Sequence, residues 1–217
     1  MEKYWESTTE KTTIPTGRSL SDYEKALDFK RDELAGKKVL DLGSGENENL
    51  SRELADQNTN VVSLNPEYYK AKMGQKVTRL PDWQRKSVAG EAEALPFKDK
   101  TFDRIFGLYS VSRFSEPSYL EWAEEKQDMH QKLRQEDKQQ VLNWLSEIAR
   151  VLKVGGEARL YPFKAESEEE FLRKYKAFFE AAASFGLRVE HKKFDDEEDG
   201  GYFEKYLVVL TKASLTD

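Results

Sequence analysis

Short apolar runs alternate with amphipathic stretches along this chain of 217 residues, as they do in α/β proteins. The amphipathic stretches carry apolar residues three or four positions apart, for example Val141, Leu145 and Ile148. The runs are three to seven residues long, and most of them have Gly, Asn or Pro on at least one side, which favours strands over helices. Five predicted strands follow from this pattern: residues 38–42, 60–64, 87–89, 102–108 and 157–161.

The last quarter of the chain has a different pattern. Ser167 and Glu170 form a capping box at the start of a predicted helix whose apolar face ends at Gly186. Two further apolar runs, residues 187–192 and 202–212, flank a short acidic turn. Strands this close in sequence favour an antiparallel hairpin, which an all-parallel dinucleotide-binding fold does not contain.

We predict one domain over residues 1–217 with two additions. Residues 1–35 form an amino-terminal arm followed by a helix over 22–35. Residues 115–140 are rich in charge and Gln, and they exceed what one crossover helix requires, so they are a predicted cap insertion.

The run Val39-Leu40-Asp41-Leu42 leads directly into Gly43-Ser44-Gly45. Glycines at the carboxyl end of a strand let the backbone turn sharply and approach a ligand closely, although a purely structural turn is the alternative. The third glycine of the dinucleotide fingerprint is replaced by Glu48. Carboxylates in this loop disfavour a pyrophosphate and favour a ligand that carries positive charge.

Four segments together resemble the class I S-adenosylmethionine-dependent methyltransferases, in particular the branch called methyltransferase type 11. The segments are VLDLGSG at 39–45, VVSLNP at 61–66, GEAEALPFKDKTFDRIF at 90–106 and EIARVLKVGGEARL at 147–160. The resemblance implies a Rossmann-like α/β fold: a seven-stranded, mostly parallel sheet with an antiparallel last strand and helices on both faces. It also implies S-adenosylmethionine as cofactor, whose ammonium and sulfonium charges suit the acidic loop.

The resemblance also implies which residues bind the cofactor. The glycine loop borders the methionyl and ribose groups, and Asp41 attracts the ammonium. Asn65 stands where the family carries an acid that binds both ribose hydroxyls, so the charge-assisted bond is missing there. Glu91 and the backbone of Ala92 are expected at the adenine. The full set of predicted cofactor contacts is Asp41, Gly43, Ser44, Gly45, Asn65, Glu91, Ala92 and Leu108.

Acceptor contacts are expected after the fourth strand, at Tyr109, Ser112 and Arg113. Many relatives carry His where this chain has Arg113, and Arg cannot act as a base at neutral pH, although it can bind a carboxylate or phosphate. A surface Arg is the alternative, and we assign no catalytic residue. Arg18 on the amino-terminal arm is a candidate lid residue, with packing as the plainer explanation.

Composition limits the partners. A net charge of −6 disfavours nucleic acid, and the basic residues between 70 and 86 fit a solvated helix face. No cysteine and two histidines disfavour a metal site, and no apolar run reaches membrane-span length. We therefore expect a cytoplasmic enzyme with a small-molecule acceptor. A non-catalytic S-adenosylmethionine-binding protein is the alternative, and an RNA methyltransferase, which needs a continuous basic face, is a weaker one.

Overall fold

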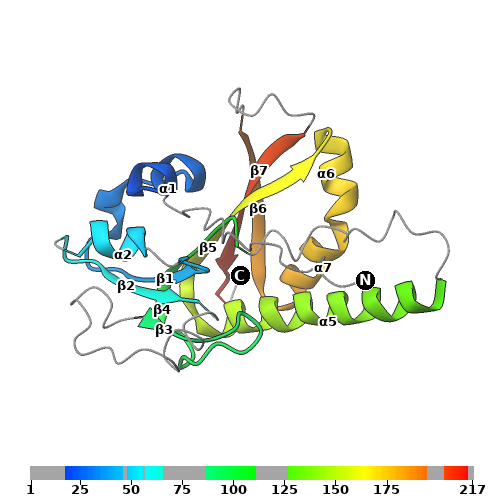
Figure 1. Cartoon of the computed structure of the whole chain (residues 1–217), viewed down its shortest axis with the longest axis horizontal. Helices are drawn as coiled ribbons and strands as arrows, with labels where there is room; N and C mark the ends of the chain where they lie inside the picture. The colour runs from blue at the N-terminus through cyan, green and yellow to red at the C-terminus, as the bar shows by residue number, and fades with distance from the viewer. Residues whose placement is uncertain are drawn as a thin grey trace, which may run out of the picture.

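A seven-stranded sheet is the framework of the protein (Figure 1). The computed structural model describes residues 18–45, 48–55, 57–65, 87–110, 127–194 and 203–214, with the backbone alone for 127–138. The strand order is β3-β2-β1-β4-β5-β7-β6. The strands are β1 Lys38–Leu42, β2 Asn60–Leu64, β3 Ser87–Val88, β4 Phe102–Leu108, β5 Leu152–Ala165, β6 Leu187–Phe194 and β7 Glu204–Lys212.

The sheet is parallel from β3 to β5, and β7 runs antiparallel to both of its neighbours, β5 and β6. Because β7 lies between β5 and β6, the two carboxyl-terminal strands form the hairpin that the sequence predicts. The predicted fold class, a mostly parallel sheet with an antiparallel last strand, is therefore confirmed.

Helices cover both faces of the sheet (Figure 1). On one face lie α1 Leu20–Leu27, the 3₁₀ helix η1 Arg31–Leu34 and α2 Asn49–Glu53. On the other lie α5 Gln127–Val151, α6 Glu168–Lys174 and α7 Lys176–Ser184. Each face has its own apolar core, and successive β1 residues alternate between them: Val39 packs with α1 and α2, whereas Leu40 packs with α5 and α7.

The predicted elements differ from the structure mainly at their ends. The helix predicted over 22–35 ends at Leu27, because Asp28 adopts a left-handed conformation with φ 53°, and η1 follows it. The helix predicted after Ser167 is divided in two at Tyr175. Ser167 does accept a hydrogen bond from the Glu170 backbone N–H, but the Glu170 carboxylate accepts from the N–H of Glu166, so only half of the capping box forms.

One continuous helix occupies the described part of the predicted cap. Helix α5 starts at Gln127 and runs to Val151, so residues 127–140 prolong the crossover helix that packs on the sheet. Several other predicted features lie outside the described residues: the arm over 1–17, the helix expected near 66, the first part of the cap and the acidic turn.

Two of the segments that carry the family resemblance, residues 90–106 and 147–160, hold each other in place. Arg150 on α5 donates hydrogen bonds to the carbonyl oxygens of Leu95 (2.9 Å) and Phe97 (2.7 Å), while Glu147 accepts one from the Leu95 N–H (2.7 Å). Arg150 also pairs with Glu147, and this contact lowers the pKa of the Glu147 carboxyl. The segment around residues 90–97 is thereby fixed to α5, so these matching residues have a structural role.

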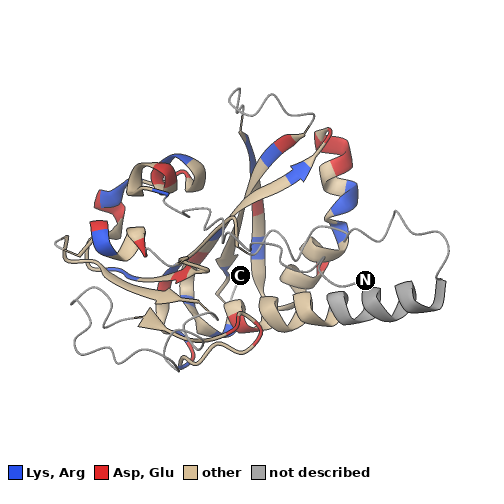
Figure 2. Ribbon diagram, viewed as in Figure 1, with Lys and Arg blue, Asp and Glu red and all other residues tan. Residues whose placement is uncertain are grey.

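Helices α1 and α6 both carry acidic residues in the first turn and basic residues in the last turn (Figure 2). The basic residues between 70 and 86 lie outside the described residues. Within the described segments, no helix has the length and apolar character needed to span a membrane.

Candidate functional site

The glycine loop follows β1 at the carboxyl edge of the sheet. Gly43 and Gly45 have φ of 74° and 68°, a region that side chains disfavour. A Cβ placed on Gly43 would lie 2.4 Å from the Cβ of Ser110, just past the end of β4. The loop and the β4 end are thus in van der Waals contact, and this approach requires glycine. The hydroxyl oxygen of Ser110 is buried without a hydrogen-bond partner in the described part of the structure.

Backbone hydrogen bonds join the ends of three neighbouring strands. The N–H groups of Gly43 (2.9 Å) and Ser44 (3.3 Å) donate to the carbonyl oxygen of Leu64, which ends β2. The N–H of Asn65 then donates to the carbonyl oxygen of Val88 on β3 at 3.2 Å. Three of the predicted cofactor contacts are therefore brought together at one edge.

Asp41 is completely buried beneath α1. The Tyr23 hydroxyl donates to its carboxylate, with distances of 3.1 Å to Oδ1 and 3.3 Å to Oδ2. Burial raises the pKa of Asp41 to about 7, the hydrogen bond from Tyr23 opposes this rise, and the negative charge of Glu48 adds to it. The sequence pattern identified Tyr23 only as an apolar residue of its helix, so its contact with Asp41 was missed.

A row of polar residues crosses the sheet at the level of Asp41. Asp41 is in register with Ser63 on β2, and Ser63 with Ser87 on β3. Side chains of register partners in a parallel sheet share a face, and here it is the face that α1 and α2 cover. The Ser63 hydroxyl lies 2.5 Å from that of Ser51 on α2. Hydroxyls and a carboxylate thus replace apolar contacts close to the carboxyl edge.

Glu48 adds a second buried carboxylate to this row. It precedes α2 in a left-handed conformation with φ 45°, and only 2% of its surface is exposed. The hydroxyl of Ser87 contacts both of its oxygens, at 2.5 and 2.7 Å. The sequence placed Glu48 in the loop, but it gave no sign that the carboxylate would be buried against β3.

Helix α1 is fastened over the loop at both ends. Near its start, the Leu20 N–H donates to the carboxylate of Glu53 (3.1 Å), and the Asn49 amide donates to the carbonyl oxygen of Arg18 (3.0 Å). At its end, the Arg159 guanidinium on β5 donates to the carbonyl oxygens of Leu27 (2.9 Å) and Asp28.

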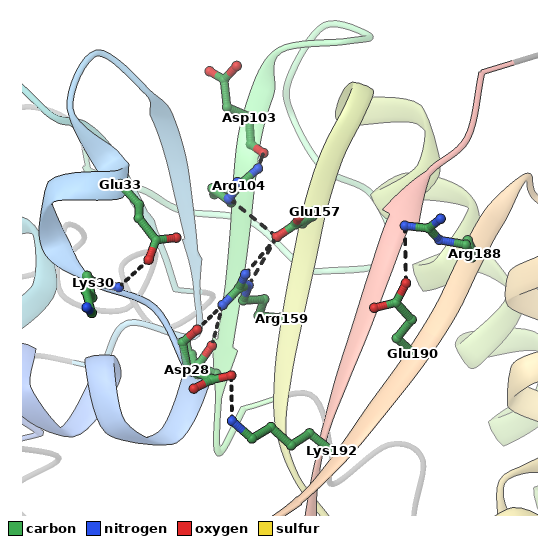
Figure 3. A network of polar contacts seen from close by, with 11 residues as sticks. Asp28, Lys30, Glu33, Asp103, Arg104, Glu157, Arg159, Arg188, Glu190 and Lys192 are labelled. Carbon is green, nitrogen blue, oxygen red and sulfur yellow. Dashed lines mark hydrogen bonds and ion pairs between the residues drawn. The ribbon is translucent and has the colours of Figure 1, made fainter.

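The contact with Arg159 belongs to a larger polar network (Figure 3). Glu157 accepts from Arg159 at 3.0 Å, and Lys192 on β6 pairs with the Asp28 carboxylate at 2.8 Å. Because β5 and β6 both take part, the carboxyl-terminal half of the sheet helps to hold the helix that covers Asp41.

Tyr109 directly follows β4 at the same edge. Its φ is 57°, its N–H donates to the Tyr161 carbonyl oxygen at 2.6 Å, and 36% of its surface is exposed. The guanidinium of Arg18 lies 3.7 Å from the centre of the Tyr109 ring, within the range of a cation–π contact. Arg18, predicted as a lid candidate, is therefore in contact with a predicted acceptor residue.

The remaining predicted residues have different surroundings. Glu91 is exposed and forms an isolated bridge with Ala94, and Ala92 is half-buried beside it. The side chain of Leu108 is buried in the core under α1, which leaves its backbone for any ligand contact. Ser112 and Arg113 lie outside the described residues. The roles of these residues stay predictions.

The chemical character of the edge is acidic and hydroxyl-rich. Asp41 and Glu48 contribute carboxylates, and Ser44, Ser87 and Ser110 contribute hydroxyls. Such groups suit a ligand with positive charge and several hydroxyls, and they would repel a pyrophosphate.

Comparison with known proteins gives a family match. Residues 40–125 match the family model described as a methyltransferase domain. A search of curated proteins finds no match to the chain.

Solved structures share the fold at low sequence identity. An S-adenosylmethionine-dependent methyltransferase from Methanosarcina mazei is 14% identical, with a TM-score of 0.53 over 82% of this chain and 92% of the other. Geranyl diphosphate methyltransferase in complex with S-adenosylmethionine is 12% identical, with a TM-score of 0.55 over 89% and 85%. The [4+2]-cyclase SpnF is 14% identical, with a TM-score of 0.53 over 82% and 76%.

Proposed function

We propose that this chain is a class I S-adenosylmethionine-dependent methyltransferase, with S-adenosylmethionine as its cofactor, and that it methylates a small-molecule acceptor; the match of residues 40–125 to a methyltransferase domain and the shared fold support this. The single observation that carries the proposal is the carboxyl edge of β1, β2 and β3. There a glycine loop, two buried carboxylates and several hydroxyls lie at or near the ends of neighbouring strands.

Each part of this edge suits one part of the cofactor. The positive φ of Gly43 and Gly45 turns the loop backbone sharply at the end of β1, where it can approach the methionyl group. Asp41 supplies negative charge toward an ammonium. Ser110 has a buried hydroxyl without a partner in the described structure, and a ligand carboxylate would give it one. These contacts support the assignment of Asp41, Gly43, Ser44 and Gly45 to the methionyl end.

The reaction needs little from the protein beyond positioning. S-adenosylmethionine supplies a methyl group already activated by a sulfonium. The acceptor's electron pair forms the new bond to carbon, and the carbon–sulfur pair stays on sulfur. Holding the acceptor in line and excluding water is the main task of the residues at this edge. We propose that Tyr109 forms one wall of the acceptor site and that Arg18 holds its ring.

The charge of the chain supports a small-molecule acceptor over a polynucleotide. The whole chain has a net charge of −6, and the helices in Figure 2 carry both acidic and basic residues. A polynucleotide requires clustered Lys and Arg, so a small molecule fits this surface better.

One observation favours a second candidate, a non-catalytic S-adenosylmethionine-binding protein. Asn65 replaces the acid expected at the ribose, and Arg113 replaces the histidine that many relatives carry. The fold itself does not decide between binding and catalysis, since function depends on the site. Consumption of the cofactor separates the two candidates.

The test uses the full chain with methyl-labelled S-adenosylmethionine and a metabolite extract. Transfer of label to a compound of low molecular mass, with release of S-adenosylhomocysteine, is the expected result. Gly43→Val, which fills the loop, is the inactive control. Tight cofactor binding without transfer to any extract would favour the non-catalytic candidate. Label in nucleic acid or protein alone would contradict the proposed acceptor class.

A further inference from the structure

The end of β2 lacks the carboxylate that ribose recognition by this superfamily leads one to expect. Asn65 stands there, and a neutral amide forms weaker hydrogen bonds to hydroxyls than a carboxylate does. A buried carboxylate is nevertheless present close by, on Glu48. The inference below concerns that carboxylate and rests on the proposed function.

Strand geometry places Glu48 beside Asn65. Ser63 and Asn65 are two residues apart, so their side chains lie on the same face, with Asn65 nearer the carboxyl edge. Ser63 is in register with Ser87, whose hydroxyl contacts the Glu48 carboxylate. The Asn65 N–H is itself bonded to the carbonyl oxygen of Val88, the residue after Ser87. Glu48 therefore approaches the end of β2 from the side of α2.

Among the described residues, the Glu48 carboxylate has few donors for a buried charge. An ionised carboxylate offers about four acceptor positions. In the described structure the hydroxyl of Ser87, a single donor, contacts both oxygens. The nearest other carboxylate in the row, Asp41, adds negative charge and no donor. Two further hydroxyl donors from a ligand would satisfy this group.

We propose that Glu48 binds the ribose hydroxyls of S-adenosylmethionine, taking over the role of the acid that Asn65 replaces. A ribose supplies two vicinal hydroxyl donors, and Glu48 supplies the negatively charged acceptor. Asn65 then contributes a neutral contact at the same end of the sugar. Glu48 has a left-handed backbone with φ 45°, and its carboxylate meets β3 at Ser87.

A purely structural Glu48 would behave differently. In that role the carboxylate would link α2 to β3 through Ser87. Its loss would distort the loop and so weaken the binding of every ligand. The ribose role instead predicts that Glu48 matters only for ligands that carry the hydroxyls. A comparison of two ligands on two proteins separates these roles.

The experiment measures dissociation constants by calorimetry for S-adenosylhomocysteine and its 2′,3′-dideoxyribose analogue. On the natural chain we expect the dideoxy analogue to bind at least about tenfold more weakly, as the loss of charge-assisted bonds implies. Glu48→Gln should raise the dissociation constant of S-adenosylhomocysteine about tenfold and change that of the dideoxy analogue less than about twofold. Glu190→Gln, on exposed β6, is the matched control and should change neither ligand.

The outcomes are distinct. Equal weakening of both ligands by Glu48→Gln, or of neither, in a variant with an unchanged thermal unfolding curve, would overturn the ribose role. If Glu48→Gln does not fold, Glu48→Asp replaces it, because the shorter side chain should lose the same preference for the hydroxyls. Failure of the natural chain to bind either ligand would overturn the proposed function itself, which distinguishes that failure from the failure of this inference.

Discussion

The two halves of the sheet differ in what they bury. Of the nine polar or charged residues buried in the described structure, eight lie between residues 41 and 65, around β1, α2 and β2. The ninth is Lys205 on β7. The half formed by β5, β7 and β6 buries aromatic residues instead, among them Phe163, Phe171 and Tyr206.

The difference suggests that one half of the sheet mainly stabilises the fold and that the other half mainly binds the ligand. Buried apolar surface stabilises a fold, whereas a buried carboxylate opposes folding unless it has partners. Asp41 and Glu48 are therefore costly to the unliganded protein, and a cationic, hydroxyl-bearing ligand would offset that cost. The aromatic half supplies stability and, through Arg159, holds the helix that covers Asp41.

The largest expected effect lies in the aromatic half. Phe171 is fully buried and stacks on Tyr206 with ring centres 4.1 Å apart, so Phe171→Ala should lower the free energy of unfolding by about 3–5 kcal/mol. Urea denaturation measures this. The neighbouring Leu172 is exposed, and Leu172→Ala should cost less than about 0.5 kcal/mol. If the folded fraction of Phe171→Ala binds the cofactor more weakly than the natural chain does, the aromatic half also determines binding, which contradicts the division of roles between the two halves.

The glycine loop should show a somewhat smaller effect on stability and a large one on binding. Gly43→Ala combines a disfavoured φ with a contact 2.4 Å from Ser110, and should cost about 2–4 kcal/mol together with the loss of measurable cofactor binding. Gly155 has the same φ of 74° with open space around it, so Gly155→Ala measures the backbone cost alone, about 1 kcal/mol. Equal costs at both positions would show that the close approach at Gly43 is unimportant.

Asp41 should make stability and cofactor binding respond oppositely to pH. Because burial raises its pKa to about 7, the folded protein binds more protons than the unfolded chain between about pH 4 and about pH 7. The free energy of unfolding of the unliganded protein should therefore fall as pH rises through this range.

Affinity should change in the other direction, because an ammonium favours the ionised carboxylate. If the bound form is fully ionised, affinity should rise about tenfold from about pH 6 to about pH 8. Calorimetry at several pH values measures this, with Asp41→Asn as the control that should show a flat profile. If the affinity of the natural chain is equally independent of pH, the Asp41 carboxylate does not interact with the ligand's positive charge.

The smallest effect is expected at Glu91, which is exposed. If its carboxylate accepts a hydrogen bond from the adenine amine, Glu91→Ala should weaken cofactor binding by about 1 kcal/mol. Glu190→Ala, which breaks an exposed pair with Arg188 (Figure 3), should leave binding unchanged. Equal affinities for Glu91→Ala and the natural chain would remove Glu91 from the adenine site.

Hydrophobic periodicity predicted the strands well because it reflects burial directly. The bounds of β1, β2 and β4 were predicted to the residue. The break at Asp28 escaped prediction, because Asp is compatible with a helix and its left-handed backbone follows from tertiary contacts with Arg159 and Lys192. The amino-terminal part of β5 was missed because Gly155 and Gly156 are typical of a turn, and here they lie in an irregular stretch of the strand.

The candidate site was predictable only in part. Gly43 and Gly45 were recognisable because their backbone requirement is encoded in residue type. The contacts of Tyr23 with Asp41 and of Ser87 with Glu48 join residues 18 and 39 positions apart, and hydroxyls and carboxylates occur equally well on a surface. Only the three-dimensional arrangement shows that these groups are buried together.

The central claim, that the acidic edge of β1, β2 and β3 holds S-adenosylmethionine, is tested most directly by titrating the full chain separately with S-adenosylmethionine and with NAD. We predict saturable binding of one S-adenosylmethionine per chain and no binding of NAD, because Asp41 and Glu48 attract the ammonium and sulfonium charges and repel a pyrophosphate. Binding of NAD with no response to S-adenosylmethionine would contradict the account.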